Sequence, residues 1–476
     1  MVRSLILAVV LAAALAGADA QGTFSPVFES QAGLAPQGKI DELVFARLKR
    51  MGIQPSRLCS DAVFVRRAYL DIIGTLPTPQ EASRFLTDRD PNKRSALIDL
   101  LLEREEFADY WAMKWSDLLR VKAEFPINLW PNAAQAYHRW IRTSIRDNKP
   151  YDRFVREMLT ESGSNFHAAP VNFYRAMQSK QPQAIAQAVA LTFMGTRAEK
   201  WPKDRLQGIA AFFSQIGYKE TGEWKEEIVF FDPAKTAAPP VAAMFPDGTP
   251  ARLAPDRDPR EVFADWLIAP KNPWFARGIV NRVWYWLAGR GIIHEPDDIR
   301  PDNPPRNPEL LAFLERELVA SRYDLKHLYR LILNSKTYQL SSRPRTDNPE
   351  GAANFAYYPL RRLDAEVLVD ALCQITGTTE SYSSAIPEPF TFIPEGRRSI
   401  GLPDGSITSP FLELFGRPSR DTGLESERNN NPSPAQRLHL LNSTHVQRKI
   451  ETSPKFQFLS RSAKNPQGLV TGMYLM

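Results

Sequence analysis

Charged residues gather at two places in the second half of the sequence where they could carry out chemistry. At the first, Arg361 and Arg362 lie shortly before Asp364 and Glu366, at the start of an expected helix. At the second, the segment Glu-Ser-Glu-Arg at 425–428 lies in a polar loop before the last expected helix. Carboxylates flanked by arginines can serve as general acid and base, or they can bind an anionic group.

If folding brings the two places together, the charged residues divide into two sets of site candidates. Glu366 and Glu427 are the candidate catalytic acid and base. The candidate ligand-binding residues are Arg361, Arg362, Asp364 and Arg428. The alternative interpretation is structural: Asp364 caps the helix, Glu366 interacts favourably with the helix dipole, and the arginines pair locally.

Candidate metal ligands are sparse. Asp297, Asp298 and Asp302 form an oxygen-rich loop that could hold a hard cation, but turns around the neighbouring prolines explain these residues better. His439 and His445 are six residues apart, on nearly opposite faces of one helix, so joint ligation would require the helix to break at Asn442. We therefore predict no metal site.

Motifs for common cofactors and hydrolases do not occur in the sequence. Gly289-Arg-Gly291 begins like a dinucleotide fingerprint, but it follows an expected helix and has His294 where the third glycine should be. The sequence contains no phosphate-binding Gly-x-x-x-x-Gly-Lys followed by Ser or Thr, no Gly-x-Ser-x-Gly and no His-Glu-x-x-His. We expect no cofactor.

The charge balance argues against nucleic acid as a partner. The 476 residues include 60 Lys and Arg against 54 Asp and Glu, a net charge of +6. The two signs are interspersed, and no basic patch of the kind that binds nucleic acid is evident. Acidic polymers remain conceivable partners.

The first twenty residues have the pattern of a secretory signal peptide. Arg3 precedes an apolar stretch at 5–16, and Ala18 and Ala20 are the small residues that a signal peptidase recognises. We expect cleavage near Ala20 and a secreted or periplasmic mature protein. The apolar run is too short to span a bilayer, which needs roughly 20 residues, and no second run approaches that length. We therefore expect no membrane span.

Cysteine and tryptophan place further limits on function. Cys59 and Cys373 are the two cysteines, which excludes a disulfide framework and a four-cysteine metal site. A single bridge between them stays open, although two separate buried thiols fit the apolar surroundings of Cys373 better. Most of the ten tryptophans fit helical core stripes. Those expected in loops, where they could stack on sugar rings, are Trp130, Trp201 and Trp224.

Helical periodicity dominates the chain. Thr78, Pro79 and Glu81 form a capping box that opens one helix, and Gly52 is suited to end another. The clear strand signal is at 227–231, and a turn-rich region around 390–415 is expected to contain short strands. The segment 232–258 is rich in proline and alanine, which indicates a linker. Helices are expected at 39–51, 79–86, 95–104, 107–119, 133–146, 152–159, 182–194, 203–216, 259–268, 275–287, 308–321, 325–338, 365–376, 434–450 and 468–476. The fold class is therefore mainly α.

Several motifs resemble a bacterial family of unknown function. They are Arg-Arg-Ala-Tyr-Leu-Asp-Ile-Ile-Gly-Thr-Leu-Pro-Thr-Pro at 66–79, Phe-Leu-Glu-Leu-Phe-Gly-Arg-Pro at 411–418 and Ala-Gln-Arg-Leu-His-Leu-Leu-Asn at 435–442. The family consists of paired domains first described in planctomycetes, in which a cytochrome-associated PSCyt domain precedes a PSD domain. The resemblance covers most of the chain from about residue 39 onward.

The resemblance implies a division of the chain into domains. A PSCyt-like helical domain is expected at 39–231, the linker at 232–258 and a PSD-like helical domain at 259–476. The apolar helix expected at 468–476 has only begun at Met476, from which we expect the natural chain to continue. The signal peptide at 1–20 and a flexible segment at 21–38 precede them.

The sequence departs from this family at two cysteine-bearing places. Relatives often carry Cys-x-x-Cys-His after the helix expected here at 182–194, whereas this chain has Gly-Thr-Arg-Ala-Glu-Lys-Trp-Pro at 195–202. Relatives also often have Cys-Glu-Cys-Glu-Arg where this chain reads Leu-Glu-Ser-Glu-Arg at 424–428. Covalent haem attachment needs two thiols and an imidazole, so a c-type haem at 195–202 is excluded.

Three hypotheses follow. We favour an exported protein that binds a ligand or an envelope partner through the charged loops of its second domain. The alternative is an extracellular polysaccharide hydrolase that uses paired carboxylates. A redox-associated role is disfavoured by the missing haem motif.

Overall fold

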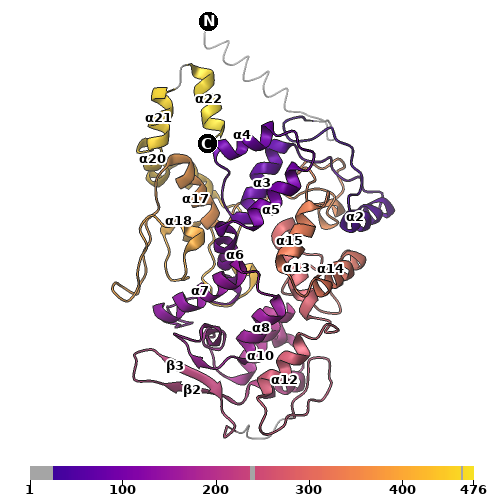
Figure 1. Cartoon of the computed structure of the whole chain (residues 1–476), viewed down its shortest axis with the longest axis vertical. Helices are drawn as coiled ribbons and strands as arrows, with labels where there is room; N and C mark the ends of the chain where they lie inside the picture. Colours follow the sequence, from indigo (N-terminus) through magenta and orange to yellow (C-terminus); the bar gives the residue numbers. More distant parts are fainter. Residues whose placement is uncertain (1–24, 236–241, 463–464, 476) are drawn as a thin grey trace.

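The computed structural model describes residues 25–235, 242–462 and 465–475 (Figure 1), so the expected signal peptide at 1–20 lies outside the described residues. The helices of the first half are α2 (Lys39–Arg50), α3 (Asp61–Ile73), α4 (Pro79–Thr87), α5 (Lys93–Leu102), α6 (Glu105–Leu118), α7 (Pro131–Arg146), α8 (Tyr151–Thr160), α9 (Asn172–Arg175), α10 (Pro182–Met194) and α11 (Lys203–Ala210). Those of the second half are α12 (Pro259–Leu267), α13 (Phe275–Ala288), α14 (Pro308–Ala320), α15 (Leu325–Asn334), α16 (Glu350–Ala353), α17 (Ala365–Thr376), α18 (Pro410–Leu414), α19 (Pro434–Asn442), α20 (Thr444–Glu451), α21 (Pro454–Ser462) and α22 (Pro466–Leu475).

The mainly helical fold class is confirmed, and it includes one small antiparallel sheet. The sheet has the order β1-β3-β2, with β1 at Gly163–Ser164, β2 at Ile216–Glu220 and β3 at Glu227–Phe231. The predicted strand at 227–231 is thus confirmed. The prediction of short strands around 390–415 is wrong. This fully described stretch contains a 3-10 turn at Ser399–Gly401, helix α18 and a single bridge from Thr408 to Ser383. Its prolines and glycines favour turns over continuous strand pairing.

Local sequence signals set several helix ends. Thr78 and Glu81 form the predicted capping box at the start of α4. Helix α17 has the predicted bounds and ends at Gly377, whose φ of 73° is a left-handed conformation that glycine adopts without strain. The single helix expected at 434–450 is wrong, because the chain breaks between α19 and α20, where the Ser443 side chain accepts a hydrogen bond from the backbone N–H of Val446 and caps α20.

The two halves of the chain share one hydrophobic core. One large cluster of buried side chains runs from α2 to the turn at Ser399–Gly401, and a second, smaller cluster joins α17 to α18. At the centre of the large cluster, the rings of Trp111 and Trp115 on α6 lie 5.3 and 6.0 Å from the ring of Trp286 on α13. Figure 1 shows α17 and α18 on one side of α6 and α13, α14 and α15 on the other. Helix α6 therefore connects the elements that carry the charged residues.

The proline-rich connection at 232–258 also packs against the core where the structure describes it. The ring of Phe245 stacks on Phe212, with centroids 5.0 Å apart, and on Trp266, at 5.1 Å. Within the described parts of the chain, no helix is long and apolar enough to cross a membrane. Cys59 and Cys373 are both free thiols, so the bridge that the sequence left open is not formed.

Candidate ligand-binding cavity

A cavity of about 790 Å³ opens where α3, α6, α13, the start of α17 and the loop 425–432 meet. All four predicted ligand-binding residues line it: Arg361, Arg362, Asp364 and Arg428. Its volume falls within the roughly 300–1,000 Å³ typical of small-molecule sites. Folding thus brings together the two charged places that the sequence singled out.

Asp364 is held ionised in the cavity wall and does not cap its helix. It occupies the residue before α17, but its side chain makes no capping hydrogen bond. Its Oδ2 lies 2.7 Å from Nζ of Lys114 and 3.3 Å from the hydroxyl of Tyr110, and its Oδ1 accepts a 2.7 Å bond from the amide of Asn430. Burial alone would raise the pKa of Asp364, but Lys114 and Arg428 hold that pKa far below its usual range. The capping role is therefore wrong, because α6 supplies a stronger partner.

Arg428 ties the loop to two helices. Its guanidinium donates to Oδ2 of Asp117 on α6 at 2.7 Å and to Oε2 of Glu366 on α17 at 2.7 Å. Arg417 lies 3.3 Å from Glu366, and Arg420 donates to Asp117 at 2.9 Å. Burial alone would raise the pKa of Glu366, but Arg428 and Arg417 outweigh it and bring the pKa down to about 2.

Arg361 and Arg362 reach distant partners, so the local pairing considered from the sequence is wrong. Arg361 donates to Oδ1 of Asp71 on α3 at 2.8 Å and to the carbonyl of Trp286 at 2.7 Å. Arg362 donates to the carbonyl oxygens of Phe415 and Asn429 at 2.7 and 2.6 Å. Arg361 thus fixes one wall of the cavity, and Arg362 fixes the loop that carries Asn429.

Glu425 lines the same cavity, but its pKa is shifted in the opposite direction from that of Asp364. Its Oε1 accepts a 2.9 Å hydrogen bond from the indole N–H of Trp286, and its side chain is 10% exposed. Burial, followed by the nearby charge of Asp297, raises the pKa of Glu425 to about 7. The cavity therefore pairs a permanently ionised carboxylate, Asp364, with a carboxyl group that is largely protonated in mildly acidic solution.

The two predicted catalytic carboxylates have other partners, and neither lines the cavity. Glu366 is fully buried in its ion pairs with Arg428 and Arg417. Glu427 accepts hydrogen bonds from the hydroxyls of Ser419 and Thr422 and from the backbone N–H of Asp421. The structure therefore does not bring Glu366 and Glu427 together across a cleft.

The predicted metal candidates are engaged by arginines. Asp297 pairs with Arg282 at 2.6 Å, and Asp298 and Asp302 both pair with Arg300, at 3.0 and 2.8 Å. The helix does break beside Asn442, and the rings of His439 and His445 lie 5.6 Å apart. Among the described residues, however, no group of three or more His, Cys, Asp or Glu side chains is arranged to hold a metal ion.

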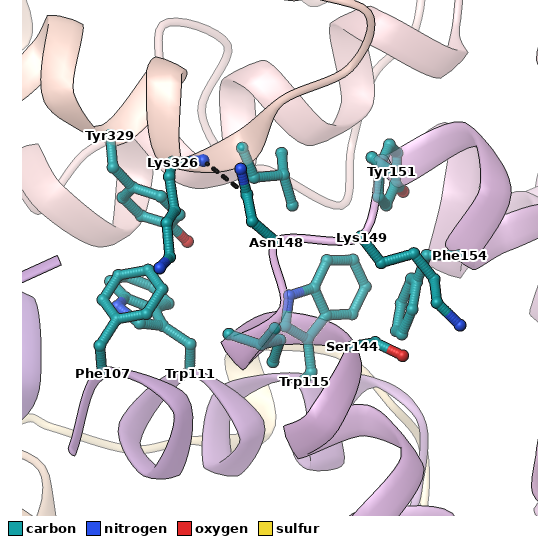
Figure 2. A pocket seen from close by; sticks show the side chains of 12 residues that line it. Phe107, Trp111, Trp115, Ser144, Asn148, Lys149, Tyr151, Phe154, Lys326 and Tyr329 are labelled. Atoms are coloured by element: carbon teal, nitrogen blue, oxygen red, sulfur yellow. Dashed lines mark hydrogen bonds between the residues drawn. The ribbon is translucent and has the colours of Figure 1, made fainter. Parts of the chain in front are cut away.

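A second, smaller hollow borders the aromatic core. Figure 2 shows Phe107, Trp111 and Trp115 of α6 facing Tyr329 and Lys326 of α15, with Asn148 beside them. Its volume of about 30 Å³ is that of a single water molecule. This hollow is a packing feature of the core, and the larger cavity is the site with room for a ligand.

The three tryptophans expected as platforms for sugar rings have different surroundings in the structure. The rings of Trp130 and Trp224 lie 4.9 Å apart, each within 5.7 Å of Phe390, and Trp224 is 60% exposed. Trp201 is half-buried under the guanidinium of Arg205, at 4.0 Å. The aromatic rings in the wall of the cavity are instead those of Tyr110, Tyr285 and Trp286.

Sequence reasoning missed several cavity residues, above all Glu425 and Lys114. Glu425 stood in the charged loop that was singled out, but nothing local distinguished it from Glu427. Lys114 lies in the apolar stripe of α6, where a buried lysine signals a carboxylate partner from elsewhere in the fold. The sequence therefore contained a signal for an ion pair at Lys114, because charged residues are rarely buried without a partner.

The fold and the cavity define a mainly helical protein with a ligand-sized polar site where its two halves meet. Residues 39–209 match the family described as PSCyt2, a protein of unknown function (DUF1549), and residues 259–464 match PSD1, a protein of unknown function (DUF1553). The chain therefore belongs to the family in which a PSCyt2 domain is followed by a PSD1 domain. No curated protein and no solved structure shows significant similarity to it.

Proposed function

We propose that the protein binds a polyhydroxylated, sugar-like ligand in the cavity between its PSCyt2 and PSD1 domains. The observation that carries this proposal is the chemistry of the wall: hydrogen-bonding carboxylates, guanidinium groups and amides stand beside the rings of Tyr110, Tyr285 and Trp286. A sugar hydroxyl both donates and accepts, so it suits a wall that offers both kinds of group. The apolar face of a sugar ring can pack on an aromatic side chain.

Asparagines 429–431 support the same class of ligand. They form one edge of the cavity, and the Asn430 amide is oriented by Asp364. Asn429 and Asn431 are exposed, and although the side-chain oxygen of Asn429 accepts a 3.0 Å bond from the backbone N–H of Asn431, the exposed amide groups can exchange water for ligand hydroxyls. A pre-oriented polar wall of this kind binds with little loss of side-chain entropy.

We also propose that the protein acts outside the inner membrane. The support is the pattern of residues 1–20, which is typical of a signal peptide. Fractionation of expressing cells, followed by mass spectrometry of the mature N-terminus, tests this. Cleavage near Ala20 is expected, and an uncut cytosolic chain would contradict it.

Polysaccharide hydrolysis is the second candidate function, and the structure gives it less support than ligand binding. The carboxylates that line the cavity are Asp71, Glu295, Asp364 and Glu425, and the pair chosen from the sequence is not among them. Release of reducing ends during the binding assays would favour it over simple binding.

Calorimetric titration with a panel of oligosaccharides tests the binding proposal. Asn430→Ala removes one wall amide and should weaken the binding of any hit about tenfold, the worth of one good hydrogen bond. Asn92→Ala, at an exposed site remote in sequence from the cavity, is the matched control and should change nothing. If no oligosaccharide binds, or if both variants behave like the unaltered protein, the cavity is not a sugar site.

A further inference from the structure

The buried wall behind the cavity carries an excess of positive charge. Ion pairs of 2.7 to 3.5 Å link its members into one buried ion network. The network consists of four cations and three carboxylates: Lys114, Arg417, Arg420 and Arg428 with Asp117, Asp364 and Glu366. One positive charge is therefore uncompensated within it.

Arg362 adds to that excess. Its hydrogen bonds go to neutral groups, the carbonyls of Phe415, Asn429 and Asn430 and the side-chain oxygen of Asn430, and among the described residues it makes no ion pair. Arg362 lines the cavity together with Lys114 and Arg428 of the network. The cavity is lined by four cations, Lys114, Arg361, Arg362 and Arg428, and by four carboxyl groups, Asp71, Glu295, Asp364 and Glu425, so its wall has one positive charge in excess when Glu425 is protonated. A ligand that brings a negative charge into the cavity would offset this excess.

Glu425 offers a carboxyl oxygen to that ligand. While Oε1 is bonded to Trp286, Oε2 accepts no hydrogen bond from any described residue, and its nearest cation is Nε of Arg282 at 3.9 Å. That Nε is itself buried without a hydrogen-bond partner. The charged and titratable groups that act on Glu425 or feel its charge are Asp297 after α13, Arg282 and Tyr285 on α13, Lys114 on α6 and Tyr329 on α15.

We propose that the ligand is a sugar bearing a carboxylate, and that this carboxylate accepts a hydrogen bond from the protonated Oε2 of Glu425 while it offsets the positive excess of the wall. The inference rests on the proposed sugar-binding function and names its ligand class. A protonated carboxyl group donates to a carboxylate in a short, charge-assisted O–H···O bond. A sulfate is a much weaker base and accepts such a hydrogen bond less well.

Ligand binding is then linked to protonation. A carboxylate bound beside Glu425 raises the pKa of Glu425 above its value of about 7 in the free protein. The bound state keeps a proton that the free protein loses, so affinity is constant below that pH and falls as the pH rises through it. The expected fall is up to about tenfold for each pH unit, as for the uptake of one proton.

The experiment compares trigalacturonic acid with its trimethyl ester, which is the same sugar without the charges. Calorimetric titrations of the full mature chain at pH 5.5 to 8.5 should show tighter binding of the acid, with an affinity that falls above pH 7. The ester should bind more weakly and without dependence on pH. Glu425→Gln keeps an oxygen for Trp286 and a donor for the ligand, so it should retain binding of the acid and abolish the pH dependence.

The controls separate this inference from the proposed function. Glu413→Gln alters an exposed carboxylate on α18 and should leave the pH profile unchanged. Equal, pH-independent binding of acid and ester would overturn the acidic ligand while sugar binding stands. Affinity that rises with pH, or a profile that Glu425→Gln leaves intact, would overturn the role of Glu425. Binding of neither compound, when neutral oligosaccharides bind, would overturn the inference alone.

Discussion

Arg428 and Glu366 form a two-point ion pair inside the protein, with Nη1 2.7 Å from Oε2 and Nη2 3.1 Å from Oε1. The pair joins the loop that carries Glu425 to the first turn of α17, and Asp117 on α6 binds the same guanidinium. The geometry of the cavity therefore depends on a charge network that water does not screen.

Removing the Glu366 carboxylate should destabilise the whole fold. Glu366→Ala leaves Arg428 and Arg417 buried with one acceptor fewer, and breaking a buried pair in this way costs about 3–5 kcal/mol. Urea unfolding followed by circular dichroism measures the change in the free energy of unfolding. Glu413→Ala, at an exposed site, should change it by less than about 0.5 kcal/mol. A similarly small loss for Glu366→Ala would mean that the network contributes little.

Glu425 should make the protein less stable as the pH rises. The pKa of Glu425 is raised from 4.5 to about 7 in the folded state, so its contribution is fully present below pH 4.5 and is lost as the pH rises toward and past 7. The free energy of unfolding should fall by up to about 1.4 kcal/mol per pH unit in this window from this group alone. Glu425→Gln should remove that slope in chemical denaturation series, and an unchanged slope would show that other groups cause it.

Asp364 and Glu366 should act in the opposite direction in acid. Their folded-state pKa values are depressed, so their stabilisation is present above the unfolded values of 3.8 and 4.5 and is lost as the pH falls below them. Denaturation of Asp364→Asn from pH 2 to 6 should show a shallower acid limb than that of the unaltered protein. A parallel acid limb would contradict the assignment of Asp364 as a permanently ionised group.

Gly416 should be required for the shape of the cavity rim. It has a φ of 77°, and a Cβ at this residue would lie 2.0 Å from the carbonyl oxygen of Asn429. Gly416→Ala should displace the 429–431 loop, lower the melting temperature and weaken sugar binding. Gly38→Ala meets no atom within 4 Å and is the control. Normal binding by Gly416→Ala would show that the asparagine loop is dispensable.

The C-terminal helices should loosen when Glu380 is neutralised. Glu380 Oε2 lies 2.9 Å from Nε2 of His445 and 3.0 Å from Nζ of Lys449, both on α20. Glu380→Gln should raise hydrogen exchange in peptides covering 443–462 without affecting α6. Unchanged exchange there would mean that packing alone holds α20 in place.

Local signals were sufficient to predict most of the longer helices and four cavity residues. They missed α3, for which no helix was expected, and the break between α19 and α20. The bounds of α17 followed from its apolar spacing and from Gly377 after its last turn. Arg361, Arg362, Asp364 and Arg428 were recognised because charges were concentrated beside a helix start and in one loop. The partners of these residues could not be recognised in the same way, since Asp71, Lys114 and Asp117 come from helices more than 200 residues earlier in the chain.

The role of Glu425 depends on tertiary packing and could not be read from its neighbours. Its side chain accepts a hydrogen bond from Trp286, 139 residues earlier, and its pKa is raised by burial and then by the charge of Asp297. Glu427 has the same local surroundings but binds Ser419 and Thr422. Sequence therefore identified the charged loop, while the fold distinguished which of its two carboxylates lines the cavity.

Hydrogen-exchange mass spectrometry with the tightest-binding oligosaccharide tests the central claim most directly. We expect slower exchange in the presence of the sugar in peptides covering 285–289, 360–367 and 424–432, which form the wall of the cavity. Protection confined to the exposed cluster of Trp130, Trp224 and Phe390, with none at the cavity, would contradict it.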